Sequence, residues 1–427
     1  MQQLKAFGFK IGLALIALLL VLWGLGFSYL LAPLALCSAL FLAFGIAAIP
    51  QLKNYQYTAW ILVAIVSGLL YPNAFLKWGT IDLRNKWLIL VVVQIVMFGM
   101  GTQMSIKDFL GIKTMGKGVL VGILCQFSIM PIAGYLLTRV FNFEPEIAAG
   151  VILIGSCSSG LASNVMVYLA KANLTLSITL TAVATLCAPL MTPLMMKLLA
   201  GTYIEIDFVT MCIQIIKIVI VPIGAALLFD AYSQGSTTFK SLVNKIFIVA
   251  LLWLTVMILG VWQYLAQSSS ENVMVVFELL NFMFGAIVVG VVYSYVIKWK
   301  PSISKLMPLL SMAGIVYFTT VTTAASRDNI LSIGIVMLLV SMLHNALGYT
   351  MGYWLSRLLG LDKNSCRTVA LEVGLQNGGM ASGLAGAMGK LATVGLASAI
   401  FSPWMNISGS ILANYWKKHN VVSNTRD

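Results

Sequence analysis

The sequence predicts an all-α polytopic membrane protein with about fourteen transmembrane helices. Of its 427 residues, 60% are hydrophobic and only 9% are charged, whereas about a quarter of the residues in a soluble domain are charged. The mean hydropathy is +0.96. The apolar residues form continuous runs of about 20 residues, which suit helices that span a bilayer and not the alternating strands of a membrane barrel.

Each predicted helix is an apolar run bounded by charged or turn-forming residues. The run at 58–72 is the shortest. In chain order the runs cover residues 8–30, 33–50, 58–72, 88–104, 119–140, 147–170, 173–199, 208–229, 246–266, 273–297, 306–325, 331–356, 366–388 and 392–415.

The first run could be read as a signal peptide, because Lys5 and Lys10 precede it. It is too long for that, and a second spanning run follows without a convincing cleavage site. We therefore expect an uncleaved membrane helix.

The positions of the basic residues predict the orientation. With the N-terminus inside and one crossing per run, 18 of the 26 Lys and Arg lie on the inner side and 7 on the outer side, with Lys217 inside a run. Positive charges gather on the cytoplasmic side of membrane proteins. Both termini should therefore be cytoplasmic, in a multi-pass cell membrane protein, expected in a bacterial inner membrane. The same scatter of charge between apolar runs argues against nucleic acid as a partner, despite the net charge of +13.

Three ionisable residues lie within apolar runs: Lys217, Glu278 and Glu372. A charged group at mid-membrane costs roughly 2.5–3.5 kcal/mol on insertion scales, so it usually faces a cavity, a partner or an ion. Glu278 lies one turn after the start of its run and is expected to reach the membrane interface. Lys217 is expected to extend to the interface or to pair with an acid.

Glu372 is followed by Gln376 and Asn377, and four glycines lie among and just after them. Glycine weakens a helix, and an interrupted helix frees backbone carbonyls that can replace water around a cation. The pattern therefore predicts an oxygen-lined site for a hard monovalent cation. Tight packing through small residues is the alternative, but packing does not require a carboxylate.

A second polar interruption lies between Gly155 and Thr181. It contains Ser163 and Asn164, and Ser177 and Thr181 lie four residues apart on one helix face. These hydroxyls could instead bond to their own helix. Two interrupted segments in corresponding halves of a chain are, however, typical of a transport site at the membrane midplane. Gln126, His344 and Asn345 are further polar candidates.

At these residues the sequence resembles the bile acid:sodium symporter family, including its bacterial members. The matching motifs fall in family order and cover roughly 55–230 and 305–418. They are Met97-Phe98-Gly99-Met100-Gly101, Gln126-Phe127-Ser128-Ile129-Met130-Pro131, Gly160-Leu161-Ala162-Ser163-Asn164-Val165-Met166, Ile216-Lys217 with Pro222, Leu343-His344-Asn345 with Gly348-Tyr349, Glu372-Val373-Gly374-Leu375-Gln376-Asn377, and Phe401-Ser402 through Trp404 with Asn406-Ile407-Ser408-Gly409-Ser410.

The resemblance implies a ten-helix core of two inverted repeats, with two broken helices that cross near the midplane, and two sodium sites. The first site would use Ser163, Asn164, Ser177, Thr181 and Glu372. The second would use Gln126, Glu372 and Gln376 with the carbonyls of Val373 and Leu375. Asn377 would face the organic substrate, with His344 and Asn345 as further substrate-facing candidates.

This chain departs from the family pattern by four additional helices. The expected organisation is two extra N-terminal helices in 1–54, the first part of the symporter core in 55–230, an inserted helix pair in 231–304, the second part of the core in 305–418, and a cytoplasmic tail in 419–427. In addition, Leu161 stands in the lead to the first broken helix where bacterial relatives more often carry threonine, so a bile acid should not be assumed.

The resemblance implies a sodium-coupled symporter that works by alternating access. Its substrate would be an organic anion such as a bile acid, a sulfated steroid, pantothenate or a keto acid. No organic cofactor, no metal other than sodium and no catalytic residue is expected. A proton-coupled or sodium-independent transporter of the same fold is the alternative, and an intramembrane Ser/His hydrolase using His344 is a remote one. The substrate and the oligomeric state stay open.

Overall fold

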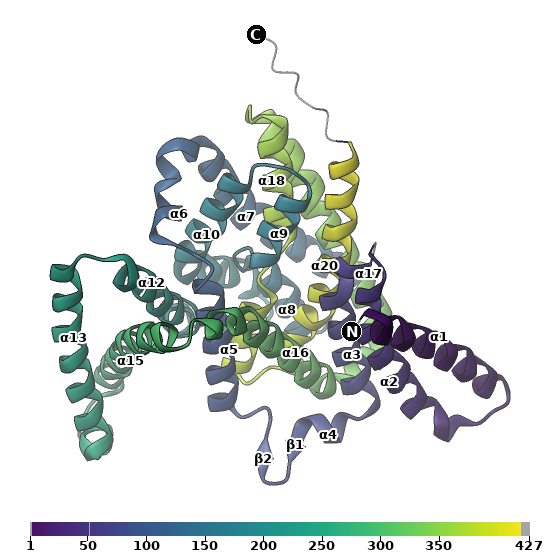
Figure 1. The fold of residues 1–427 in the computed structure, drawn as a ribbon, viewed down its shortest axis with the longest axis horizontal. Helices are drawn as coiled ribbons and strands as arrows, with labels where there is room; N and C mark the ends of the chain where they lie inside the picture. Colours follow the sequence, from purple (N-terminus) through teal and green to yellow (C-terminus); the bar gives the residue numbers. More distant parts are fainter. Residues whose placement is uncertain (1, 51, 420–427) are drawn as a thin grey trace.

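The computed structural model describes residues 2–50 and 52–419, almost entirely as helices (Figure 1). The first half of the chain contains α1 (Gln2–Gly24), α2 (Ser28–Gly45), α3 (Gln56–Leu70), α4 (Pro72–Leu76), β1 (Lys77–Trp78), β2 (Ile81–Asp82), α5 (Lys86–Gly101), α6 (Ile106–Leu110), α7 (Ile112–Phe141), α8 (Pro145–Ser156), α9 (Leu161–Leu169), α10 (Leu174–Met195) and α11 (Phe208–Ile215). The second half contains α12 (Val221–Gln234), α13 (Thr237–Val256), α14 (Trp262–Ser268), α15 (Glu271–Trp299), α16 (Met307–Ala325), α17 (Arg327–Leu358), α18 (Lys363–Gly374), α19 (Gly378–Ala387) and α20 (Val394–Lys418).

Short segments of other helix types join these elements. The 3₁₀ turns are Ile46–Ala48, Lys53–Tyr55 and Pro301–Leu306. Segments of π-helix continue α10, α11 and α13, at Met196–Ala200, Ile216–Ile220 and Met257–Val261. The two strands form an antiparallel hairpin in which Lys77 pairs with Asp82.

The predicted fold class is confirmed. Ten helices of the described residues are long and apolar enough to cross a membrane, and shorter apolar helices occur at Thr58–Leu70, Lys86–Gly101 and Pro145–Ser156. The predicted runs at 147–170 and 366–388 are each broken in two, as α8 with α9 and α18 with α19. The predicted end of the first run is wrong: α1 ends at Gly24 and α2 begins at Ser28, so the run 8–30 extends into α2. The helical span that contains the run 246–266 is kinked at Gly260, and each of the other runs corresponds to one span.

Several helices begin well before the apolar run that predicted them. α13 begins at Thr237 and contains Lys240 and Lys245, although its run begins at 246. α7 begins at Ile112 and not at 119. A lysine ends an apolar run, but it is a good helix former and leaves the backbone hydrogen bonds intact. Of the predicted tail at 419–427, only His419 is among the described residues.

The spans form two packed groups. The panel, defined here as α3, α5, α11–α12 and α16, is held together by α16, which packs on both α3 and α5, while α12 packs on α5. The core, defined as α7–α10 and α17–α20, packs α7 on α8, α17 on both α7 and α18, and α20 on α8. The half-helix α19 of the core lies against α5 of the panel.

The four helices predicted to be additional lie at opposite ends of the molecule (Figure 1). Helices α1 and α2 pack on each other, and α2 contacts α3. At the other end α15 packs on α12 of the panel and on α13. Little of these helices is buried within the chain, since only 11% of the apolar window of α1 and of α15 is buried. Most of their apolar surface is therefore free to face lipid or another protein.

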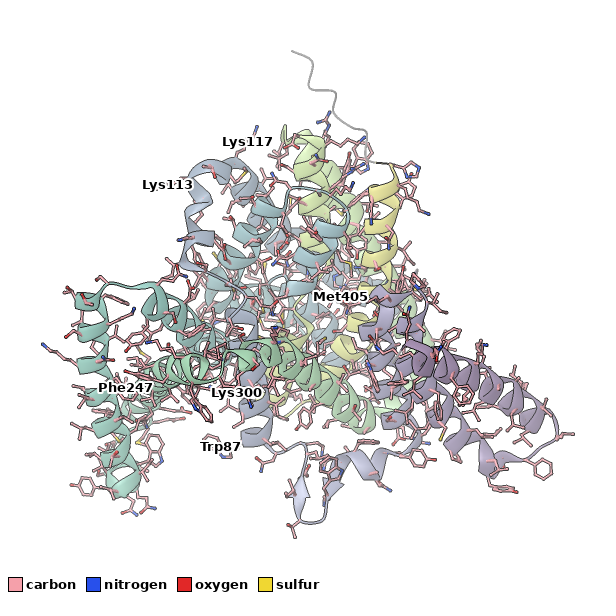
Figure 2. All side chains as sticks on the ribbon, in the orientation of Figure 1. Trp87, Lys113, Lys117, Phe247, Lys300 and Met405 are labelled. Carbon is pink, nitrogen blue, oxygen red and sulfur yellow. The ribbon has the colours of Figure 1, made fainter. Side chains whose placement is uncertain are left out.

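Two loops that are predicted on opposite sides of the membrane lie at opposite ends of the molecule (Figure 2). Lys113 and Lys117, predicted on the inner side, lie at one end of the molecule (Figure 2). Trp87, which follows Lys86 on the predicted outer side, lies at the opposite end. Which compartment each end faces stays a prediction.

Side-chain caps fix the starts of the two core helices that meet at the site. Asn173 accepts a hydrogen bond from the Leu176 N–H at 3.1 Å at the start of α10. Asp362 accepts from the Ser365 N–H at 3.1 Å at the start of α18. The Thr368 hydroxyl of α18 donates to the Asn173 carbonyl at 3.1 Å, which links the two helix starts. Such caps satisfy N–H groups that a helix leaves free, and here they also fix the relative register of α10 and α18.

Gly150 gives a test of core packing. A Cβ at this position would lie 2.4 Å from the Val394 carbonyl oxygen of α20. We expect Gly150→Val to push α8 from α20 and to destabilise the protein by about 1–3 kcal/mol, read as a lower melting temperature in detergent. Gly224→Val in α12 is the matched control, since a Cβ at Gly224 would have no atom within 4 Å. Equal melting temperatures for Gly150→Val and Gly224→Val would contradict the packing of α8 on α20.

Candidate functional site

The two broken helices cross at their unwound segments. Ser159 and Gln376 form an antiparallel bridge. The Asn377 N–H donates to the Ser158 carbonyl at 2.8 Å, and the Gly160 N–H donates to the Leu375 carbonyl at 3.3 Å. Unpaired backbone groups are costly in a membrane interior. Each break therefore supplies partners for the other.

Gln126 of α7 joins the two breaks through its side chain. Its Nε2 donates to the Cys157 carbonyl and to Gln376 Oε1, both at 2.9 Å. The Gln376 Nε2 in turn donates to the Val373 carbonyl at 2.6 Å. Gln126 is fully buried, and its Oε1 has no hydrogen-bond partner among the described residues. A buried oxygen with no donor is a natural ligand for a cation.

Glu372 lies at the centre of a second oxygen cluster. It is 0% exposed, and none of the ion pairs among the described residues includes it. The hydroxyl of Thr181 donates to its Oε2 at 2.8 Å, and the Ser177 hydroxyl donates to its Oε1. Both hydroxyls also lie within hydrogen-bond distance of Asn164 Oδ1, at 3.3 Å from Thr181 and 2.7 Å from Ser177.

This cluster is rich in hydroxyl groups but holds no positive charge. Ser177 and Thr181 donate to the two carboxylate oxygens of Glu372, and the hydroxyls of Ser159 and Ser163 also interact with this carboxylate. These neutral groups stabilise the carboxylate, but none of them balances its charge. A bound cation, or a proton on Glu372, would supply the missing positive charge.

The ligand chemistry suits a hard cation. The convergent groups are hydroxyl, amide and carboxylate oxygens, which hard cations prefer over sulfur or imidazole ligands. No group of three or more His, Cys, Asp and Glu that could hold a metal occurs among the described residues.

The structure brings most of the predicted cation ligands together in these two clusters. Asn164, Ser177 and Thr181 surround Glu372, while Gln126 meets Gln376. Ser163 lies beside them, and its hydroxyl donates to the Gly160 carbonyl at 2.7 Å. The Val373 and Leu375 carbonyls lie in the second break, where Gln376 and Gly160 already donate to them.

The three residues expected to face the substrate are buried and hold backbone in place. Asn377 caps α19 by accepting from the Met380 N–H at 3.0 Å. Asn345 donates to the Gly374 carbonyl at 2.7 Å, which is the last carbonyl of α18. His344 is 1% exposed, and its Nε2 lies 2.8 Å from the Met130 carbonyl oxygen. Their contact with substrate stays a prediction.

Two serines of the site were not predicted as ligands, although each lies in a segment that the sequence singled out. Ser159, in the polar interruption between Gly155 and Thr181, interacts with the Glu372 carboxylate and lies 3.5 Å from the Thr181 hydroxyl. The hydroxyl of Ser408, in the last of the family motifs, donates to Asn345 Oδ1 at 2.5 Å.

Lys217 Nζ lies 2.6 Å from Glu278 Oε2, so the predicted pairing of Lys217 with an acid is confirmed. The sequence did not indicate that Glu278 is this acid.

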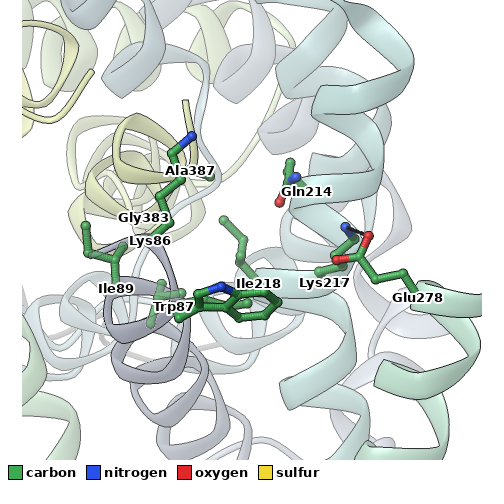
Figure 3. Close-up of a pocket in the computed structure, with 11 residues that line it drawn as sticks. Lys86, Trp87, Ile89, Gln214, Lys217, Ile218, Glu278, Gly383 and Ala387 are labelled. Atoms are coloured by element: carbon green, nitrogen blue, oxygen red, sulfur yellow. Dashed lines mark hydrogen bonds and ion pairs between the residues drawn. The ribbon is translucent and has the colours of Figure 1, made fainter. Parts of the chain in front are cut away.

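A cavity of about 210 Å³ lies between the core and the panel (Figure 3). Its walls come from α5, from the end of α11 and the π segment after it, from α15 and from α19. Lining residues include Lys86, Trp87, Gln214, Lys217, Glu278 and Ala387. A neighbouring cavity of about 250 Å³ shares Gln214 and Ala387 with it and reaches Asp207 and Lys390.

Comparisons with known proteins relate most of the chain to sodium-dependent transporters. The model of the sodium bile acid symporter family matches residues 90–269. An uncharacterized sodium-dependent transporter of Bacillus subtilis is 30% identical over 377 residues, which cover 87% of this chain and 94% of that protein. A probable chloroplastic sodium/metabolite cotransporter of Arabidopsis thaliana is 27% identical and covers 85% of this chain and 73% of its own length. The human ileal sodium/bile acid cotransporter is 24% identical, and the match covers 67% of this chain and 65% of the length of that protein.

Among solved structures, a sodium proton antiporter of Methanocaldococcus jannaschii has a similar fold. The TM-score is 0.50 at 15% sequence identity, and the match covers 91% of this chain and 98% of that one. At this identity the likeness concerns the fold alone.

The role of Gln126 in joining the breaks can be tested by stability. Gln126→Leu removes the donor to the Cys157 carbonyl and to Gln376, and leaves both acceptors buried without that partner. We expect a loss of about 1–3 kcal/mol, seen as a lower melting temperature. The exposed Gln103→Leu is the control, and a Gln126→Leu protein as stable as that control would contradict the described network.

Proposed function

The chain belongs to the sodium bile acid symporter family, and on this premise we propose that it is a symporter that couples sodium entry to uptake of a small organic anion. As a family member with many membrane-spanning helices it is a multi-pass membrane protein. The observation that carries the proposal is Glu372: a fully buried carboxylate among hydroxyl and amide oxygens, with no basic side chain paired to it among the described residues.

The first sodium ion is proposed to bind between α9, α10 and α18. Its ligands would be Glu372, the side chains of Asn164, Ser177 and Thr181, and Ser163 after a change of rotamer. The hydroxyl protons of Ser177 and Thr181 would then turn away from the carboxylate, because a hydroxyl oxygen can bind a cation while its proton points elsewhere. The carboxylate neutralises the ion, so a buried charge is replaced by a buried neutral pair.

The second sodium ion is proposed to bind at the second break. Gln126 Oε1, which has no donor among the described residues, supports this assignment. Glu372 and Gln376 would complete the site with the carbonyls of Val373 and Leu375. Since both carbonyls currently accept hydrogen bonds, the ion must compete with the Gln376 amide and the Gly160 N–H.

Sodium binding would couple to transport through the backbone of the crossing. Ions that bind the released carbonyls and side chains would favour one arrangement of the two breaks, and α19 lies directly against the panel. The core could then move against the panel to open each side in turn. Two sodium ions crossing a 100 mV potential release about 4.6 kcal/mol at roughly 2.3 kcal/mol per charge, and a monoanion takes back about half.

Proton coupling is the alternative, because a proton on Glu372 also removes the unpaired buried charge of its carboxylate. Uptake that follows a pH gradient without sodium would favour it. A Ser/His hydrolase has less support: in the described part of the chain His344 is hydrogen-bonded to the Met130 carbonyl and to no serine hydroxyl.

A melting titration tests the sodium proposal. Sodium that binds only the folded state should raise the melting temperature until the sites are saturated. At one hundred times the dissociation constant, it should increase the free energy of unfolding by about 2.7 kcal/mol. Potassium at equal ionic strength should not. Glu372→Gln should abolish the sodium effect, while Glu144→Gln, an exposed acid beside the start of α8, should keep it. Equal stabilisation by sodium and potassium would overturn the proposal.

Thr181 and Thr185 give a matched pair one helical turn apart. Thr181 donates to Glu372, whereas Thr185 donates only to the Thr181 carbonyl of its own helix, at 2.8 Å. We expect Thr181→Val to raise the half-saturating sodium concentration about tenfold, a loss of about 1.4 kcal/mol, and Thr185→Val to leave it unchanged. If both variants bind sodium like the original protein, Thr181 is not a ligand.

A further inference from the structure

Lys217 is a buried cation outside the two oxygen clusters. It lies in the π segment after α11 and is 4% exposed. Its Nζ is 2.6 Å from Glu278 Oε2 of α15 and 5.9 Å from the centre of the Phe282 ring. Phe282 can stabilise the cation through its ring face. Glu278 is the only carboxylate that pairs with it among the described residues.

The backbone around Lys217 is held in an irregular conformation. Pro222, one turn further on, has no N–H to donate to the preceding turn. The Lys217 carbonyl accepts instead from the Gln94 side chain of α5, at 3.1 Å. Segments of π-helix are rare and often occur at functional sites. Here the π segment places Lys217 in the panel wall of the cavity.

The cavity beside Lys217 is suited to a small anion. Lys217 and Glu278 line the panel side, Lys86 and Trp87 lie at the start of α5, and α19 of the core forms the opposite wall (Figure 3). Two lysines and one glutamate line it, so its charge is positive on balance. Its volume of about 210 Å³ is below the roughly 300–1,000 Å³ of pockets for drug-sized ligands. A small metabolite fits this space, whereas a larger ligand would also have to occupy the neighbouring cavity that shares Gln214 and Ala387.

The two members of the ion pair differ in exposure. The Lys217 side chain is 5% exposed and the Glu278 side chain 31%. A buried cation requires a counter-charge, because leaving it unpaired in a membrane interior is costly. Glu278, the more exposed partner, is the one that can move away into the cavity when another anion arrives.

We propose that Lys217 binds the carboxylate of a small substrate, and that Glu278 occupies Lys217 until the substrate displaces it. The exchange keeps one negative charge on Lys217 throughout. The apolar part of the substrate would lie against Trp87 and Ile218. This assignment rests on the proposed symport function and adds to it a recognition residue and a competing carboxylate on the helix α15, which is predicted to be an insertion.

Melting titrations with pyruvate and pantothenate, in saturating sodium, test the exchange. In Glu278→Gln the competing carboxylate is lost, so the apparent dissociation constant of the better-binding probe should fall about tenfold. In Lys217→Gln it should rise at least about tenfold. Glu271→Gln removes an exposed acid from the first turn of the same helix and should behave like the original protein.

Lys217→Gln leaves Glu278 without its partner and could fail to fold, so the double variant Lys217→Gln/Glu278→Gln is measured beside it. The double variant removes both charges and should keep its sodium-induced melting shift while losing probe binding. Wild-type probe affinity in the double variant, or no gain of affinity in Glu278→Gln, would overturn the exchange.

The sodium response separates this inference from the function on which it rests. If sodium stabilises the protein but neither probe stabilises the wild type or Glu278→Gln, the carboxylate site at Lys217 is refuted and the sodium sites stand. If sodium itself has no specific effect, the symport proposal fails first.

Discussion

A single buried carboxylate, Glu372, sets the conditions that the rest of the core must meet. It is fully buried without a basic partner among the described residues, and a lone charge in a membrane interior is too costly to keep. Hydroxyls of α10 and the amide of Asn164 therefore converge on it. They lower the free-energy cost of burying the carboxylate but do not balance its charge. A bound cation would balance it.

The broken helices follow from the same requirement. A continuous helix uses its own carbonyls and offers none to an ion, whereas a break releases them and must then satisfy them elsewhere. The two breaks do this by crossing, with Ser159 and Gln376 paired and Gln126 donating to both segments. Asn345 secures the end of α18 in the same way. The crossing is therefore polar and buried. It depends on side chains whose oxygens could also bind an ion.

The panel presents a different kind of polar group. Lys217 lies in an irregular turn of the panel, and its partner Glu278 comes from α15, little of which is buried within the chain. The ion pair thus ties α15 to the panel at the edge of a cavity that α19 also lines. One wall of this cavity belongs to the core and the other to the panel. A ligand held there would contact both groups of helices, as coupled movement of the two requires.

The sequence by itself determined the spans and the unusual residues within them, because both depend on local chemistry. Run length predicts a membrane helix, and a carboxylate among glycines predicts a break with a ligand. It also predicted that Ser177 and Thr181 share a face. The family resemblance placed Gln126 and Gln376, 250 residues apart, in one site, but the tertiary structure decided that their side chains bond directly. Only the tertiary structure paired Lys217 with Glu278, 61 residues on. Hydropathy is summed over neighbours along the chain, whereas these pairs form only when helices from different parts of the chain pack side by side.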